Sequence, residues 1–169
     1  GLEGVFVRHY DVGVLEKTAR GMAARELTFD TSRSVPESAY HVCLRRIESM
    51  PKAFVAALNG TTMGGGFELA LACDIRLAAA GPYWIGLPEI NIGLLPGAGG
   101  TQRLPRLIGE ARALELMLQG RTLSPVEAAH YGLVAECVDG DVVARALDLA
   151  HELAAKPPRA LANIKRLVR

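Results

Sequence analysis

Apolar and polar positions along this chain alternate between the period of a strand and that of a helix. Residues 53–58 (AFVAAL) form a continuous apolar run that is short enough for a buried strand. Residues 74–79 (DIRLAA) predict a second strand, and residues 3–7 (EGVFV) read as the end of another. Because helix-like segments separate these runs, the pattern predicts the α/β class.

Helical periodicity and start signals predict the first helices. Residues 14–34 are mixed and polar, which predicts a short helix followed by a loop. In residues 34–50, Ser34 and Pro36 are candidate start signals, and the predicted helix ends near Pro51. We expect its apolar side to consist of Ala39, Val42, Leu44 and Ile47. The dipeptide Asn59-Gly60 predicts a turn, and residues 67–73 (FELALAC) a short helix.

The second half of the chain carries clearer boundaries. Ser124 is the predicted N-cap of a helix, with Pro125 at its first position, Glu127 completing a capping box and Gly132 ending it. Residues 133–138 then predict a strand, and residues 141–155 an amphipathic helix. A last helix follows Pro157 and Pro158. We therefore expect a core over residues 1–140 and a C-terminal helical segment over residues 141–169.

Composition and charge narrow the class of protein. The chain has 169 residues, 50% of them hydrophobic, which is enough for one domain with a sizeable core. Its formal net charge is +1 without a basic block, so we expect neither nucleic acid nor a membrane surface as a partner. No apolar run is long enough to span a bilayer.

The cysteines indicate a reducing compartment. Cys43, Cys73 and Cys137 are widely spaced and odd in number, which argues against a disulfide framework and for buried thiols. No signal peptide is visible, but the chain opens like the interior of a domain, so an upstream targeting segment can be missing. We expect a cytoplasmic protein, or one of the mitochondrial matrix if such a segment exists.

A run of three glycines, residues 64–66, precedes the helix that carries Glu68. Glycines at a helix N-terminus leave backbone N–H groups open to a phosphate or a developing oxyanion. A dinucleotide-binding fingerprint would need glycine where Leu69 stands, and no Gly-Lys-Ser/Thr of a P-loop follows. Tight packing alone remains an alternative explanation for these glycines.

A second segment, residues 86–109 (GLPEINIGLLPGAGGTQRLPRLIG), repeats this combination. It holds another lone acid, Glu89, and a second glycine-rich turn over residues 97–100. Two carboxyl groups in apolar surroundings are typical of general acid/base chemistry, because desolvation raises carboxyl pKa values toward neutrality. Either acid by itself would more often be a cap or a surface residue.

Residues 59–80 (NGTTMGGGFELALACDIRLAAA) and residues 86–138 resemble the two signature regions of the enoyl-CoA hydratase/isomerase, or crotonase, superfamily. The resemblance runs with few gaps from about Gly4 to the end. It implies a crotonase-like spiral of ββα units that lacks some N-terminal strands and C-terminal helices, so the chain is a fragment or joined pieces of a longer one. The crotonase superfamily itself carries out several different reactions on this fold.

The resemblance also implies roles for individual residues. Gly65 matches the family's oxyanion-hole donor, and the N–H of Tyr10 is the candidate for the second donor. Glu68 and Glu89 match the two acids of the hydratase branch, which hold a water and add it across a 2,3-double bond. Gly97 is expected to help position that water through its backbone.

The implied activity is reversible hydration of 2-enoyl-CoA thioesters without a metal or redox cofactor, CoA being part of the substrate. A double-bond isomerase or another acyl-CoA lyase or hydrolase is the alternative on the same fold. A non-catalytic acyl-CoA-binding or assembly subunit is the alternative from another class. The resemblance further implies a homo-oligomer, a trimer or a hexamer.

Some positions depart from the family pattern, and others are expected to have only a structural role. Arg8 and His9 stand where the family has Ala-Gly, and one extra residue lies between the two signature regions. Asp74, Arg76 and Arg103 are expected to hold the structure rather than touch substrate. The other histidines, His41, His130 and His151, show no metal-ligand spacing and are expected at the surface or half-buried.

Overall fold

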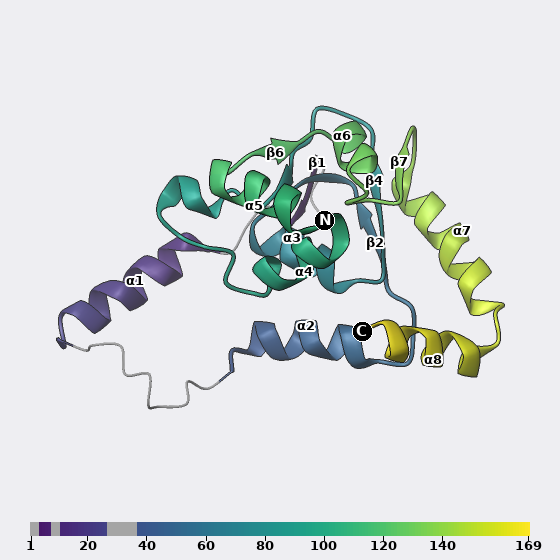
Figure 1. Ribbon diagram of the computed structural model, residues 1–169, viewed down its shortest axis with the longest axis horizontal. Helices are drawn as coiled ribbons and strands as arrows, with labels where there is room; N and C mark the ends of the chain where they lie inside the picture. Colours follow the sequence, from purple (N-terminus) through teal and green to yellow (C-terminus); the bar gives the residue numbers. More distant parts are fainter. Residues whose placement is uncertain (1–3, 8–10, 27–36) are drawn as a thin grey trace.

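The computed structural model describes residues 4–7, 11–26 and 37–169. The strands are β1 (Gly4–Val7), β2 (Val55–Leu58), β3 (Gly60–Met63), β4 (Ile75–Ala79), β5 (Ile85–Gly86), β6 (Thr122–Leu123) and β7 (Glu136–Val138). The helices are α1 (Val12–Ala23), α2 (Ala39–Ser49), α3 (Gly65–Ala72), α4 (Gly100–Ile108), α5 (Glu110–Gln119), α6 (Pro125–His130), α7 (Val142–Ala154) and α8 (Pro158–Val168), with a 3-10 turn, η1, over Glu89–Ile92. The predicted α/β class is confirmed (Figure 1).

Two sheets organise the chain. One has the order β1-β3-β5-β6 and the other the order β2-β4-β7. All pairs are parallel except β5 with β6, which is antiparallel. Strands β2 and β4 lie in one sheet, and the strands that directly follow them, β3 and β5, lie in the other. The chain therefore passes directly from one sheet to the other after β2 and again after β4, with no helix in between.

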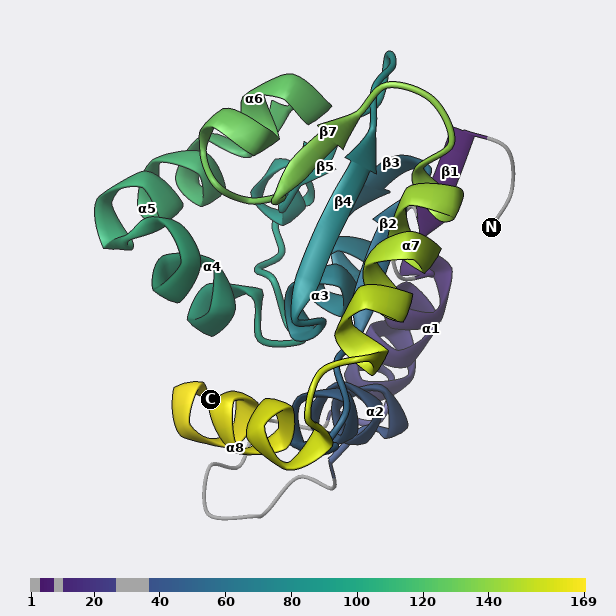
Figure 2. The same ribbon diagram turned by 90° about the vertical axis from the view of Figure 1, so that its right-hand side faces the viewer.

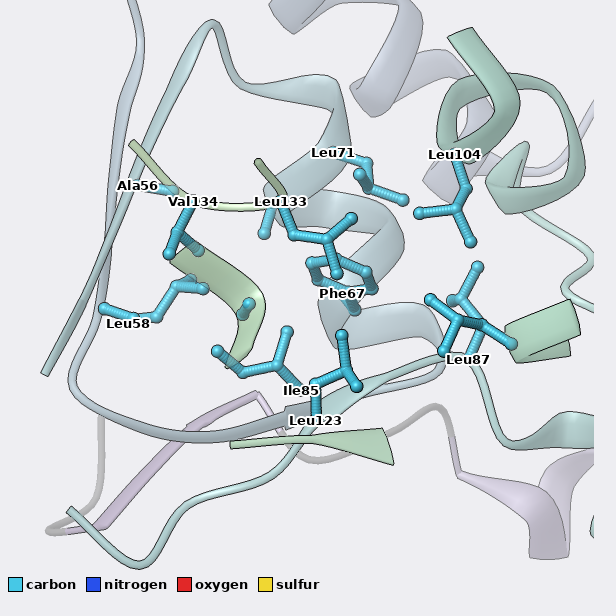
Figure 3. Packing of buried hydrophobic residues seen from close by; sticks show 14 of the residues in the cluster. Ala56, Leu58, Phe67, Leu71, Ile85, Leu87, Leu104, Leu123, Leu133 and Val134 are labelled. Carbon is cyan, nitrogen blue, oxygen red and sulfur yellow. The ribbon is translucent and has the colours of Figure 1, made fainter. Parts of the chain in front are cut away.

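The core fills the space between the sheets and the helices α3 to α6. Phe67 of α3 is fully buried at its centre, surrounded by Leu71, Ile85, Leu87, Leu104, Leu123 and Leu133 (Figure 3). A second cluster, around Leu77 and Val142, packs α7 onto the outer face of β2 and β4. Because α3 lies inside the larger cluster, the position of its N-terminus is fixed by packing on several sides.

Helices α2 and α8 lie together at one end of the molecule, below the sheets in Figure 2. The side chain of Lys165 connects them, because its Nζ donates to the carbonyl of Ile47 at 2.8 Å. By contrast α1 buries none of its residues and points away from the body of the molecule (Figure 1).

Two close backbone approaches explain glycines in this architecture. A Cβ at Gly60 would lie 2.0 Å from the carbonyl carbon of Gly4, and one at Gly66 would lie 1.8 Å from the carbonyl oxygen of Val7. Both contacts press β1 against its neighbours, β3 and α3. No larger residue fits there without displacing backbone.

Several predicted boundaries are confirmed and others are wrong. Ser124 caps α6 with the full capping box, and Asp141 caps α7. The start of α2 was predicted wrongly, because Ser38 is its N-cap and accepts from the N–H of His41. The turn expected at Asn59-Gly60 is also wrong, since β3 begins at Gly60.

All three cysteines are free thiols. Cys73 is buried as expected, but Cys43 is exposed and Cys137 only half-buried, so the prediction of three buried thiols is wrong for these two. Within the described ranges, no helix has both the length and the apolar content needed to cross a membrane.

Candidate active site

The first glycine run forms the turn between β3 and α3. Gly64 has a φ of 55°, which favours glycine, and its N–H donates to the carbonyl of Gly86 in β5 at 3.0 Å. Gly65 is the first residue of α3, so its N–H has no acceptor within the helix. Its carbonyl accepts a hydrogen bond from the hydroxyl of Tyr40 in α2. The turn is thus held from both sides, with the positive end of α3 facing outward.

Glu68 lies in the first turn of α3 and is only 3% exposed. Its Oε1 accepts hydrogen bonds from the N–H groups of Ala98, at 2.7 Å, and Gly100, at 2.8 Å. These amides belong to the second glycine-rich turn, so this carboxylate joins the two segments that the sequence singled out. The described residues provide no donor to its other oxygen, Oε2, which leaves that oxygen for a ligand.

The second glycine-rich turn fits closely around Glu68. A Cβ at Gly100 would lie 2.7 Å from Leu87 Cδ1 and 3.1 Å from Glu68 Oε1. Gly99 has a φ of 95° and opens α4. Glycine at these positions therefore lets the backbone approach the buried carboxylate closely enough for both amides to donate.

Arg103 of α4 fixes the same turn from outside. Its Nη1 donates to the carbonyl of Ala98 at 2.7 Å, while Nε and Nη2 form a bidentate pair with Glu48 of α2. The hydrogen bonds from Arg103 hold the pKa of Glu48 below its usual range. Arg103 thus contacts the turn and α2, which agrees with the structural role expected from the sequence.

Glu89 is the first residue of η1 and is half-buried. Its Oε2 is buried and has no hydrogen-bond partner among the described residues. Burial raises the pKa of Glu89, a backbone hydrogen bond opposes this, and the negative charge of Glu68 raises it further. The charge of Glu68 thus acts on Glu89, and the amides of the second glycine-rich turn hold Glu68.

The structure places four of the five expected site residues. Gly65 and Glu68 lie on the first turn of α3, Glu89 begins η1, and Gly97 is an exposed residue of the second glycine-rich turn. Tyr10 lies outside the described residues, as do Arg8 and His9. The part of the Tyr10 N–H in an oxyanion hole stays a prediction.

Two side chains of α2 that the sequence did not single out also contact the site. Besides Tyr40, His41 contacts it through Nε2, which lies 2.8 Å from the carbonyl oxygen of Gly97. Burial, together with the negative charge of Glu68, raises the pKa of Tyr40 to about 12, so its hydroxyl stays protonated and donates. No local sequence pattern marks either residue, because their acceptors are 25 and 56 positions away.

Other buried polar groups hold the fold. Arg76 donates to the carbonyls of Ala70, Cys73 and Leu133. Asp74 accepts from the N–H of Phe54 and pairs with Lys165 at 2.7 Å. Their bonds all go to protein groups, which agrees with the structural role expected for Asp74 and Arg76.

A cavity of about 930 Å³ lies between α8 and the elements α2, α4 and β4, but Gly65, Glu68, Glu89 and Gly97 do not line it. We place the candidate active site at the two glycine-rich turns, because Glu68 joins them and its charge raises the pKa of Glu89. No group of three or more potential metal ligands occurs in the part of the chain that the structure describes.

The family model for enoyl-CoA hydratase/isomerase matches residues 17–169. The chain belongs to the enoyl-CoA hydratase/isomerase family. A probable enoyl-CoA hydratase of Bacillus subtilis (strain 168) is 46% identical over 127 residues, covering 74% of this chain and 49% of the relative. The fatty acid oxidation complex subunit alpha of Shewanella halifaxensis is 41% identical over 160 residues, covering 94% of this chain and 21% of that subunit.

Solved structures of the family confirm the predicted crotonase fold. The crystal structure of an enoyl-CoA hydratase from Polaromonas sp. JS666 superposes with a TM-score of 0.83 at 32% identity. The match covers 99% of this chain and 63% of that one. This family member spans about half the length of the Bacillus relative and about a fifth of the Shewanella subunit.

Proposed function

We propose that the protein hydrates 2-enoyl-CoA thioesters reversibly, with Glu68 and Glu89 as its acid/base pair. The observation that carries the proposal is the junction at Glu68, where a buried carboxylate accepts two amides from one glycine-rich turn while it lies on the helix that begins at the other. Family membership and the similarity to enoyl-CoA hydratases support the substrate class.

The reaction follows from the unequal surroundings of the two acids. Glu68, an acceptor held in place, takes a proton from water through Oε2 while the water oxygen bonds to C3. Glu89, whose pKa is raised, gives its proton to C2. A following water returns a proton from Glu68 to Glu89, so that one water has been added in total.

Electron density moves onto the thioester oxygen as the C3–O bond forms. In the proposal the N–H of Gly65, at the start of α3, donates to that oxygen, and the N–H of Tyr10 is the second donor. One such donor is worth about 3–4 kcal/mol in the transition state. The N–H of exposed Gly97 binds the attacking water.

The proposal needs no metal or redox cofactor, and CoA enters with the substrate. We further propose that the active form is a homo-oligomer, either a trimer or a hexamer. A double-bond isomerase would need only one acid, so the presence of both favours hydration.

Loss of the enoyl-thioester absorbance of crotonyl-CoA, followed with EDTA present, tests this function. We expect Glu68→Gln and Glu89→Gln each to lower kcat by at least about a hundredfold, since each removes one proton-transfer group. Glu115→Gln, on an exposed face of α5, is the matched control and should retain full activity. Near-normal turnover in both site variants would exclude the pair, and crotonyl-CoA binding without turnover in the unaltered protein would favour a binding subunit.

A further inference from the structure

Helix α2 presents three side chains to the backbone of the two glycine-rich turns. Tyr40 donates to the carbonyl of Gly65, His41 to the carbonyl of Gly97, and Glu48 acts through Arg103 on the carbonyl of Ala98. The contacts of Tyr40 and His41 hold a carbonyl toward α2, whereas the carbonyl of Ala98 is held by Arg103 of α4. Because the C=O and N–H of a trans peptide point in opposite directions, a carbonyl held toward α2 aims the N–H of the same peptide away from it.

The peptide between Gly97 and Ala98 shows this effect directly. Its carbonyl oxygen lies 2.8 Å from His41 Nε2, and its N–H lies 2.7 Å from Glu68 Oε1. The acceptor is a carbonyl, so Nε2 of His41 carries the hydrogen. One peptide plane thus connects the imidazole to the candidate catalytic carboxylate.

The two ends of this peptide are packed differently. Gly97 is exposed, and a Cβ there would meet only the carbonyl oxygen of Leu95, at 3.9 Å. Buried Ala98 belongs to a cluster with Leu44 and Ala72, which restrains its end of the plane, so the contact with His41 restrains the exposed Gly97 end. The neighbouring peptide differs, because the Arg103–Glu48 pair holds its carbonyl independently of His41.

We propose that His41 is a positioning residue: it orients the Gly97–Ala98 peptide, so that the Ala98 N–H of this peptide holds Glu68 in place for the attacking water. The catalytic part of this inference rests on the proposed function. His41 itself does not touch substrate. Its loss should therefore lower kcat while leaving KM nearly unchanged.

The test compares His41→Leu with His41→Gln, whose side-chain N–H₂ can occupy the place of Nε2. We expect His41→Leu to lower kcat about tenfold with KM within about twofold, the loss typical of one hydrogen bond that positions a charged group. His41→Gln should restore kcat to within about twofold of the unaltered protein. His151→Leu, at an exposed position of α7, is the control and should change neither constant.

A second readout does not depend on the reaction. Amide protons that donate to a carboxylate resonate far downfield, so the Ala98 signal in a ¹H–¹⁵N spectrum reports its bond to Glu68. We expect that signal to move upfield in His41→Leu and to return in His41→Gln, while the Gly100 signal changes less. An unmoved Ala98 signal in His41→Leu, or a glutamine variant no better than the leucine variant, overturns the inference. If the unaltered protein hydrates no enoyl-CoA, only the proposed function fails, and the amide signal alone decides the role of His41.

Discussion

Glu68 and Glu89 show how two residues of one type acquire different properties from their surroundings. Two amides donate to Glu68, whereas the buried Oε2 of Glu89 receives no hydrogen bond from any residue that the structure describes. A buried carboxylate oxygen without a donor is costly when the group is charged. Glu89 therefore carries a destabilising charge above its raised pKa, as proton-donating groups commonly do.

This charge gives a prediction about stability. The pKa of Glu89 is higher in the folded protein than in the unfolded chain, so the folded state binds the proton more tightly. The free energy of unfolding therefore falls as the pH rises from the pKa of the unfolded chain to the higher pKa of the folded protein. Glu89→Gln removes the charge. We expect it to raise Tm relative to the unaltered protein at about pH 8, and the gain to vanish below about pH 4.

Thermal unfolding followed by circular dichroism over this pH range measures the effect. Glu115→Gln, at an exposed position, is the control and should leave Tm unchanged at every pH. A Tm difference for Glu89→Gln that stays constant with pH would contradict the argument.

At the scale of elements, the contact between α3 and β1 decides where the Gly65 amide lies. Gly66 packs against the carbonyl of Val7 with no room for a methyl group, so the helix and the strand touch backbone to backbone. Any side chain at this position separates them. Such a displacement moves the first turn of α3, together with Gly65 and Glu68.

Gly66→Ala tests this contact. We expect it to lower the free energy of unfolding by about 3 kcal/mol, because overpacking displaces backbone, and to abolish hydration. Gly21→Ala is the matched control, since a Cβ there, in the last turn of α1, meets nothing within 4 Å, and it should stabilise by about 0.5 kcal/mol. Urea unfolding measures both variants. Equal stabilities of the two would show that β1 yields to the added methyl group.

The elements also show what the sequence could and could not predict. The capping box at Ser124 was found because it depends on residues three positions apart. Strand β3 was missed, because its residues, Gly-Thr-Thr-Met, join a glycine run and carry little apolar signal. The N-cap of α2 is Ser38 rather than Ser34, because both are serines that can cap and the sequence alone did not distinguish them.

The sequence indicated residues of the candidate site, but not the contacts between them. Family-like motifs indicated Glu68, Glu89, Gly65 and Gly97, yet the two amides that hold Glu68 could not be derived from local patterns. Their carboxylate acceptor lies 30 and 32 positions away, and such pairings depend on how the sheets are connected. The contact of His41 with the second turn was missed for the same reason.

In the whole molecule, α8 is attached to the rest through Lys165. Its Nζ donates to the carbonyls of Ile47 and Lys52 and to Asp74 Oδ2, and it lies 4.8 Å from the centroid of the Phe54 ring. The side chains of Lys165 and Asp74 are 7% and 19% exposed. A buried ion pair of this kind is costly to break on one side only.

Lys165→Met should therefore lower the free energy of unfolding by about 3 kcal/mol, because it leaves the Asp74 carboxylate without its main cation. Arg20→Ala removes an exposed ion pair within α1 and should cost less than about 0.5 kcal/mol. Chemical unfolding of the two variants provides the comparison. Similar losses in both would mean that Arg169, 3.3 Å from Asp74, compensates for the missing lysine.

The attachment by Lys165 has a consequence for synthesis on the ribosome. Asp74 and the carbonyls of residues 47 and 52 emerge early, whereas the ammonium group that binds all three is made 91 residues after Asp74. A nascent chain that already holds both glycine-rich turns still has this acid without its lysine. The contacts that attach α8 to this end of the molecule thus form only after translation has passed Lys165.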